Sequence, residues 1–135
     1  MKAKAIDFVY YTVRDVVSSV PFYRDTLGLE LESLSEEGQG WAEFAAPPTT
    51  LALVGATPDS PDPGAGGSAV ALAVDDVERA VEELQEEGTT VLMDSVETGV
   101  CTMAVVTDPD GNPLMLHRRD DGTHGRVDPL PEYSE

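Results

Sequence analysis

The chain carries one arrangement of elements twice, and this internal repeat constrains its fold more than any other feature. The first copy, IDFVYYTVRDVVSSVPFYRDTLGLELE, and the second, SAVALAVDDVERAVEELQEEGTTVLMD, each read as strand, helix, glycine and strand. VRDV at 13–16 aligns with VDDV at 74–77. Two more apolar runs follow in each copy, near 41–46 and 50–54 and near 100–107 and 113–117. Two copies predict a pseudo-symmetric domain rather than a solenoid.

Composition divides the chain into modules and connections. We expect a first module over 1–54 and a second over 68–118. Proline and glycine crowd residues 55–67, which is typical of a linker or long surface loop. Residues 119–135 lack apolar periodicity and are expected to form an acidic arm or a strap over a neighbour.

The two expected helices differ in clarity. In the second, an aspartate at 75 or 76 can cap the start and Gly88 suits the end. Its buried stripe is predicted to be Val77, Val81 and Leu84. In the first, Pro21 would break a hydrogen bond if the helix began at Asp15. We therefore expect that helix to start at Ser18 or Ser19, after a turn over 15–17.

A turn precedes the last apolar run, in TDPDGNPLMLH at 107–117. Pro109 presets one turn dihedral, Asp108 can bond back to the backbone, and Gly111 tolerates positive φ. The short strand that follows ends on His117.

The charge is strongly acidic, because 26 acids stand against 8 bases and give a formal net charge of −18. Such a surface repels nucleic acid and is typical of proteins adapted to high salt. A groove that attracts a cationic ligand is the alternative, and the direction of the acids decides between them. The facing of four strand acids stays open at this point: Glu30, Glu32, Glu43 and Glu97.

Location follows from what the sequence lacks. One cysteine cannot form an internal disulfide, and no apolar run is long enough for a membrane helix. The first residues lack the zones of a signal peptide. We therefore expect a cytoplasmic protein without a membrane or nucleic-acid partner.

Three stretches together resemble the vicinal oxygen chelate superfamily: FYRDTLGL, the paired VxDV segments and DPDGNP. This family includes glyoxalase I (lactoylglutathione lyase), ring-cleaving dioxygenases, fosfomycin-resistance enzymes and bleomycin-binding proteins. The resemblance covers about residues 4 to 118. It implies an α+β fold of two βαβββ modules that form a curled mixed sheet around a cup, and it implies a homodimer.

The resemblance also implies where a divalent metal would be held, on the first and last strand of each module. These positions fall at Phe8, Ala52, Ala69 and Met115. None offers the imidazole, carboxylate or thiolate that such metals prefer. The sequence therefore predicts a protein with no metal and no cofactor.

Side chains alternate along a strand, so one face of each strand can be assigned to the cup. Small residues at 69, 71 and 73 leave volume that either bulky neighbours or a ligand must fill. Both outcomes stay open. If a ligand fills the volume, the expected binding residues are Phe8, Tyr10, Trp41, Ala52, Ala69, Ala71, Met115 and His117.

Three functional hypotheses follow. The first is a metal-free protein that binds a small apolar or aromatic molecule. The second is an enzyme, lyase- or dioxygenase-like, in which His117, Glu43 and Tyr10 move protons. The third is a non-catalytic interaction subunit with collapsed cups.

Overall fold

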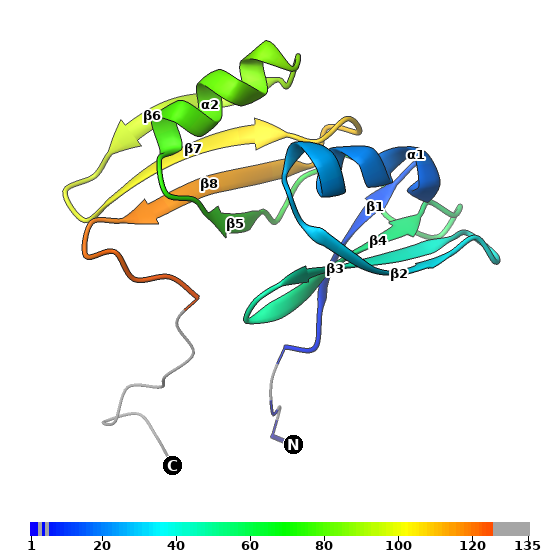
Figure 1. Ribbon diagram of the computed structural model, residues 1–135. Coiled ribbons are helices and arrows are strands. Elements are labelled where there is room, and N and C mark those ends of the chain that lie inside the picture. The colour runs from blue at the N-terminus through cyan, green and yellow to red at the C-terminus, as the bar shows by residue number, and fades with distance from the viewer. Residues whose placement is uncertain (3, 5, 126–135) are drawn as a thin grey trace.

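The computed structural model describes residues 1–2, 4 and 6–125 (Figure 1). The first module contains β1 (Val9–Val13), α1 (Val16–Pro21), the π-helical turn η1 (Phe22–Thr26), β2 (Glu30–Ser35), β3 (Trp41–Ala46) and β4 (Thr49–Gly55). The second contains β5 (Val70–Ala73), α2 (Val77–Glu86), β6 (Val91–Glu97), β7 (Cys101–Thr107) and β8 (Pro113–Arg119). The strands and the second helix fall where the sequence repeat predicts them.

Each module forms its own four-stranded mixed sheet. The first sheet has the order β1-β4-β3-β2 and the second has the order β5-β8-β7-β6. In both, the first and last strands of the module pair in parallel and the other pairs are antiparallel. The fold is α+β, and the two sheets repeat one topology, as the duplicated sequence implies.

The first helix begins earlier than predicted. It starts at Val16 with Asp15 as its N-terminal cap residue, so the expected start at Ser18 or Ser19 is wrong. Pro21 then lies at the last position of α1, and the chain widens directly after it into η1. There the Leu27 N–H donates to the Phe22 carbonyl, five residues back. The wider turn accommodates the proline, which has no N–H to donate.

The second helix matches its prediction. Asp76 caps it, with its side chain accepting a hydrogen bond from the Arg79 N–H. The three residues of the expected stripe are all buried: Val77, Val81 and Leu84. Gly88 follows the helix with a φ of 88°, a conformation that favours glycine.

One apolar core runs through both modules. Its members come from the sheet faces under the two helices, and its largest fully buried side chains include Tyr23, Phe44, Leu53 and Leu114. Figure 1 shows α1 and α2 each lying across one face of its own sheet. Among the residues that the structure describes, no helix covers the opposite face of each sheet, which we call its open face.

The DPDGN turn joins the second module to the first. Asp108 is 3% exposed, and its carboxylate accepts from the backbone N–H groups of Asp110 and Asn112 at 2.9 and 2.8 Å. It also accepts from the Tyr23 hydroxyl at 2.8 Å and from Nδ2 of Asn112 at 2.9 Å. The same Nδ2 donates to the Thr12 carbonyl of β1 at 3.0 Å. The predicted bond from Asp108 to its own backbone is confirmed, and the turn also binds the first module.

The other side of this turn fixes the connection between the modules, residues 56–69. The Gly64 N–H donates to Oδ1 of Asn112 at 3.0 Å. Gly64 has a φ of 76°, and a Cβ atom there would collide with the Asp110 carbonyl oxygen. Only glycine fits this close approach.

Tyr11 forms a second junction. Its hydroxyl donates to the Pro113 carbonyl at 2.6 Å and accepts from the Val70 N–H at 2.7 Å. One side chain of β1 thereby bonds to β8 and to β5. These hydrogen bonds hold the two edges of the modules together, and the bond to Pro113 requires a protonated phenol.

Both buried tyrosines predict a loss of stability in alkali. Burial raises the pKa of Tyr23, and the Asp108 charge and hydrogen bond raise it further. Burial also raises the pKa of Tyr11; the Val70 N–H opposes this and the Asp108 charge adds to it. Above pH 10 the unfolded chain releases these protons while the folded chain keeps them, so the free energy of unfolding should fall. Below pH 10 this contribution is complete.

We expect the free energy of unfolding to fall with a slope that approaches about 1.4 kcal/mol per pH unit for each proton that the folded chain retains. Urea unfolding of the wild type, Tyr11→Phe and Tyr23→Phe between pH 8 and 11 measures it. Each variant should be less stable than the wild type at pH 8. Its free energy of unfolding should then fall less steeply with pH above pH 10. Parallel curves for all three proteins would contradict the assignment.

Candidate functional site

The open face of the first sheet carries an aromatic shelf, which we define as Phe8, Tyr10 and Trp41. Phe8 and Tyr10 are 43% and 56% exposed, whereas Tyr11 and Val13 on the other face lie in the core. The Phe8 ring meets Trp41 edge to face at 5.3 Å between centroids and lies 6.4 Å from Tyr10. Offset aromatic contacts of this kind fix ring positions. The shelf is therefore an ordered apolar surface.

Strand register places Glu43 beside the shelf. Tyr10, Ala52 and Glu43 face one another across β1, β4 and β3. Ala52 is fully buried, although it lies on the open face. The Trp41 indole N–H donates to Oε1 of Glu43 at 2.8 Å. The carboxylate thus orients the indole ring, and the other strand acids Glu30, Glu32 and Glu97 are exposed.

The open face of the second sheet is lined by thioethers and small residues. One row across it is Ala71, Met115, Val105 and Met93; the next is Ala73, His117, Met103 and Val96. We call Met93, Met103 and Met115 the methionine wall. Methionine is flexible and polarisable, and it makes favourable contacts with aromatic rings. Such a wall can adapt to the shape of an apolar molecule.

The sequence-predicted site residues therefore lie in two groups on two sheets. Phe8, Tyr10, Trp41, Glu43 and Ala52 belong to the first sheet. Ala69, Ala71, Met115 and His117 lie on or just before strands of the second. Met93, Met103 and Val105 were missed, although their alternation within β6 and β7 offered a signal. The pairing of β6 with β7 has irregular register, so the regular alternation that would predict facing is interrupted along β6.

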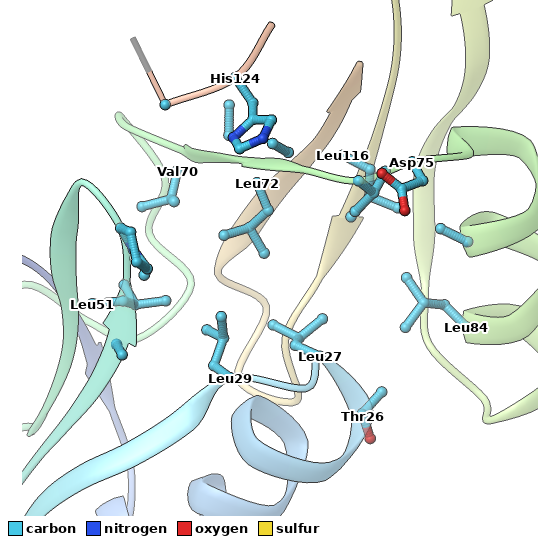
Figure 2. A pocket seen from close by; sticks show the side chains of 18 of the residues that line it. Thr26, Leu27, Leu29, Leu51, Val70, Leu72, Asp75, Leu84, Leu116 and His124 are labelled. Atoms are coloured by element: carbon cyan, nitrogen blue, oxygen red, sulfur yellow. The ribbon is translucent and has the colours of Figure 1, made fainter. Parts of the chain in front are cut away.

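A separate apolar cavity of about 870 Å³ lies between the modules on the helix side (Figure 2). Figure 2 shows Leu27 and Leu29 of the first module opposite Leu72, Leu84 and Leu116 of the second. Of the predicted ligand-binding residues, only Ala71 lines this cavity. It is thus a second candidate site, distinct from the open faces.

A smaller cavity of about 430 Å³ adjoins the open face of the second sheet. Its walls include Ala71, Ala73 and His117 from that sheet. The segment that follows contributes Arg118, Arg119 and residues 122–125. His124 and Gly125 line both cavities, so the larger and the smaller meet beside β5.

The four positions at which the family resemblance places a metal do not fit one. Phe8, Ala52, Ala69 and Met115 offer a ring, two methyl groups and a soft thioether, none of them a ligand for a hard or borderline divalent cation. Among residues 1–2, 4 and 6–125, no group of three His, Cys, Asp or Glu side chains could hold a metal ion. A helix that could span a membrane is likewise absent from this described part of the chain.

Two βαβββ modules with a helix on one face of each sheet and an open opposite face define the glyoxalase-like class of α+β proteins. The chain belongs to the Glyoxalase/Bleomycin resistance protein/Dioxygenase superfamily, which it matches over residues 5–116.

Relatives within the family differ in what their names say they do. The chain is 30% identical over 123 residues to lactoylglutathione lyase of Salmonella typhimurium LT2, covering 84% of this chain and 91% of that one. TnmS3, an antibiotic binding protein from Streptomyces sp. CB03234, has a similar structure, with a TM-score of 0.73 and 28% identity over 89% of this chain and 99% of that one. A glyoxalase/bleomycin resistance protein from the same organism gives a TM-score of 0.69 with 28% identity, covering 84% and 100% of the two chains.

Proposed function

We propose that this protein is a metal-free homodimer that binds a small apolar or aromatic molecule between the open faces of its two copies. The observation that carries the proposal is the pair of apolar open faces: the aromatic shelf, where Phe8 and Tyr10 are exposed, and the half-buried methionine wall. Exposed apolar patches on a soluble domain mark binding surfaces. Two copies can place the shelf of one opposite the wall of the other and enclose a cup.

Charge supports the same conclusion. The chain has 26 acids, yet Glu43 is the acid beside the shelf and it is bonded to Trp41. The two central rows of the second sheet's open face contain no carboxylate: Ala71, Ala73, Met93, Val96, Met103, Val105, Met115 and His117. The acids therefore cover other surfaces, which favours the acidic surface over an acidic groove within the cup. The similarity to TnmS3, named an antibiotic binding protein, supports a small molecule as the ligand.

Trp41 is the only tryptophan and lies on the shelf, so it reports directly on ligand binding. N-phenyl-1-naphthylamine, a neutral fluorescent probe, should bind and quench the Trp41 emission. Tyr10→Ala and Met115→Ala should weaken binding about tenfold, because each removes part of one cup wall. Probe fluorescence during titration of each variant measures the affinities.

Two controls locate the probe. Val17→Ala trims an exposed apolar residue on α1 and should bind like the wild type. Leu72→Phe partly fills the 870 Å³ cavity between the modules and should also leave the affinity unchanged. Loss of binding in Leu72→Phe with full binding in Tyr10→Ala would place the ligand in that cavity and contradict the proposal.

Metals should leave the protein's stability unchanged. One equivalent of Zn²⁺, Ni²⁺, Mn²⁺ or Fe²⁺ is expected to give no saturable rise in melting temperature, and EDTA no fall, because the four fold-specific positions offer no suitable ligand. Thermal unfolding with each ion measures this. A saturable stabilisation that EDTA reverses would disprove the metal-free part of the proposal.

An enzymatic function is the second candidate, supported by the identity to lactoylglutathione lyase and by the shared row of Tyr10 and Glu43. Proton transfer by these two with His117 needs the first sheet of one copy to face the second sheet of another. Assays for lyase and ring-cleaving activity test it, with His117→Ala as the variant that must lose the activity. A dimer that binds no probe would instead support the interaction subunit.

A further inference from the structure

Basic side chains are unevenly distributed in this acidic chain. Three arginines of the described residues are paired with carboxylates: Arg14 with Asp110 at 3.4 Å, Arg24 with Asp25 at 2.8 Å and Arg79 with Glu83 at 3.1 Å. Arg118 and Arg119 are different, because no carboxylate of the described residues forms an ion pair with either. Two adjacent arginines that pair with no described carboxylate have positive charge available for a ligand.

Both arginines line the 430 Å³ cavity, and so do both histidines of the chain, His117 and His124. Among the described residues that line it, Asp75 is the one acid, and Asp121 lies beside it, bonded to Thr123. Two guanidinium groups therefore line this cavity in a protein that is otherwise strongly acidic.

The cavity adjoins the face of the proposed cup through Ala71, Ala73 and His117. Met115, His117 and Arg119 alternate along β8 and share its open face, so each is about 7 Å from the next. The face thus changes from a thioether to an imidazole to a guanidinium along one strand. An apolar body over Met115 would place an attached polar group near His117 and Arg119. Nη1 of Arg119 lies 3.5 Å from Oγ1 of Thr123, a contact that orients the guanidinium at the cavity wall.

We propose that the cup's ligand carries an oxyanion, a carboxylate or a phosphate, and that Arg119 and His117 bind it in this cavity, with Arg118 adding positive charge at its edge. The inference rests on the proposed function and adds the chemical class of the ligand. A guanidinium donates two parallel hydrogen bonds to such a group, and these charge-assisted bonds are stronger than neutral ones. The ligand is therefore an aromatic or apolar acid, not a cation.

Four naphthalene probes test this by titration calorimetry at low salt: 2-naphthoate, 2-naphthyl phosphate, neutral 2-naphthylmethanol and 2-naphthylmethylammonium. We expect at least one anion to bind about tenfold more tightly than the alcohol, and the ammonium most weakly. The anion that binds more tightly shows whether the site prefers a carboxylate or a phosphate. The advantage should shrink in 0.5 M salt, because the arginines are near solvent.

Variants assign the preference to the cavity. Arg118→Gln/Arg119→Gln should bind the anions no more than about threefold better than the alcohol, with alcohol affinity unchanged. Arg24→Gln removes one positive charge at an exposed ion pair outside the cavity and should keep the full preference. Melting temperatures of these proteins check that each remains folded.

The outcomes separate the two proposals. If the alcohol binds and neither anion binds better, or if the ammonium binds best, the oxyanion site is wrong and the proposed function stands. The same conclusion follows if the anion preference survives in the double variant. If no naphthalene binds, the proposed function fails and the oxyanion site fails with it.

Discussion

Asp108→Ala should lower the free energy of unfolding by about 3–5 kcal/mol, the largest loss of stability expected from any single polar residue here. The carboxylate accepts hydrogen bonds from the Tyr23 hydroxyl, the Asn112 side chain and two backbone N–H groups. Alanine would leave these buried donors without their acceptor. Urea unfolding at neutral pH measures the change.

Two further variants sharpen this test. Asp108→Asn retains an acceptor oxygen but brings an amide N–H toward donors, so its stability should lie between wild type and alanine. Asp59→Ala removes an exposed aspartate of the connection between the modules and should change stability by less than about 0.5 kcal/mol. A loss below 1 kcal/mol for Asp108→Ala would show that the turn does not bind the modules together.

Met103→Glu should convert the proposed dimer into a monomer. Met103 lies between His117 and Val96 on the open face of the second sheet. A glutamate there would be desolvated on association without a partner, which raises the dissociation constant by about a hundredfold or more. Light scattering during size-exclusion chromatography over a range of protein concentrations measures the assembly.

The matched control places the same charge on a helix. Val17→Glu changes an exposed apolar residue of α1 and should leave the dimer intact. A wild type that is monomeric at about 100 µM, or a Met103→Glu variant that dimerises like the wild type, would contradict the proposed arrangement.

Local patterns in the sequence predicted the elements and much of their facing. Apolar alternation predicted the strands, and Tyr10, expected on the cup side of its strand, lies on the open face while its neighbour Tyr11 is in the core. The start of α1 was wrong because Pro21 was expected to exclude an earlier start. Helix propensities do not predict a π-helical turn after a proline, because such a turn depends on the tertiary structure around it.

Contacts between distant residues could not be predicted in the same way. Tyr23 and Asp108 are 85 residues apart, and Tyr11 and Pro113 are 102 apart. Their side chains read as ordinary packing and turn residues. The sequence placed Arg118 at the end of the second module and Arg119 at the start of the aperiodic arm, and only the folded chain shows them beside both histidines. These contacts depend on module placement, which one sequence does not encode in a local pattern.

The bond from Gly64 to Asn112 has a consequence for how two chains can associate. It ties the middle of residues 56–69 to the DPDGN turn, so the connection behaves as two short spans instead of one long tether. Exchange of halves between chains through an opened hinge would first have to release this tie. Two molecules can meet more readily through faces that are already formed, with each keeping its own halves side by side.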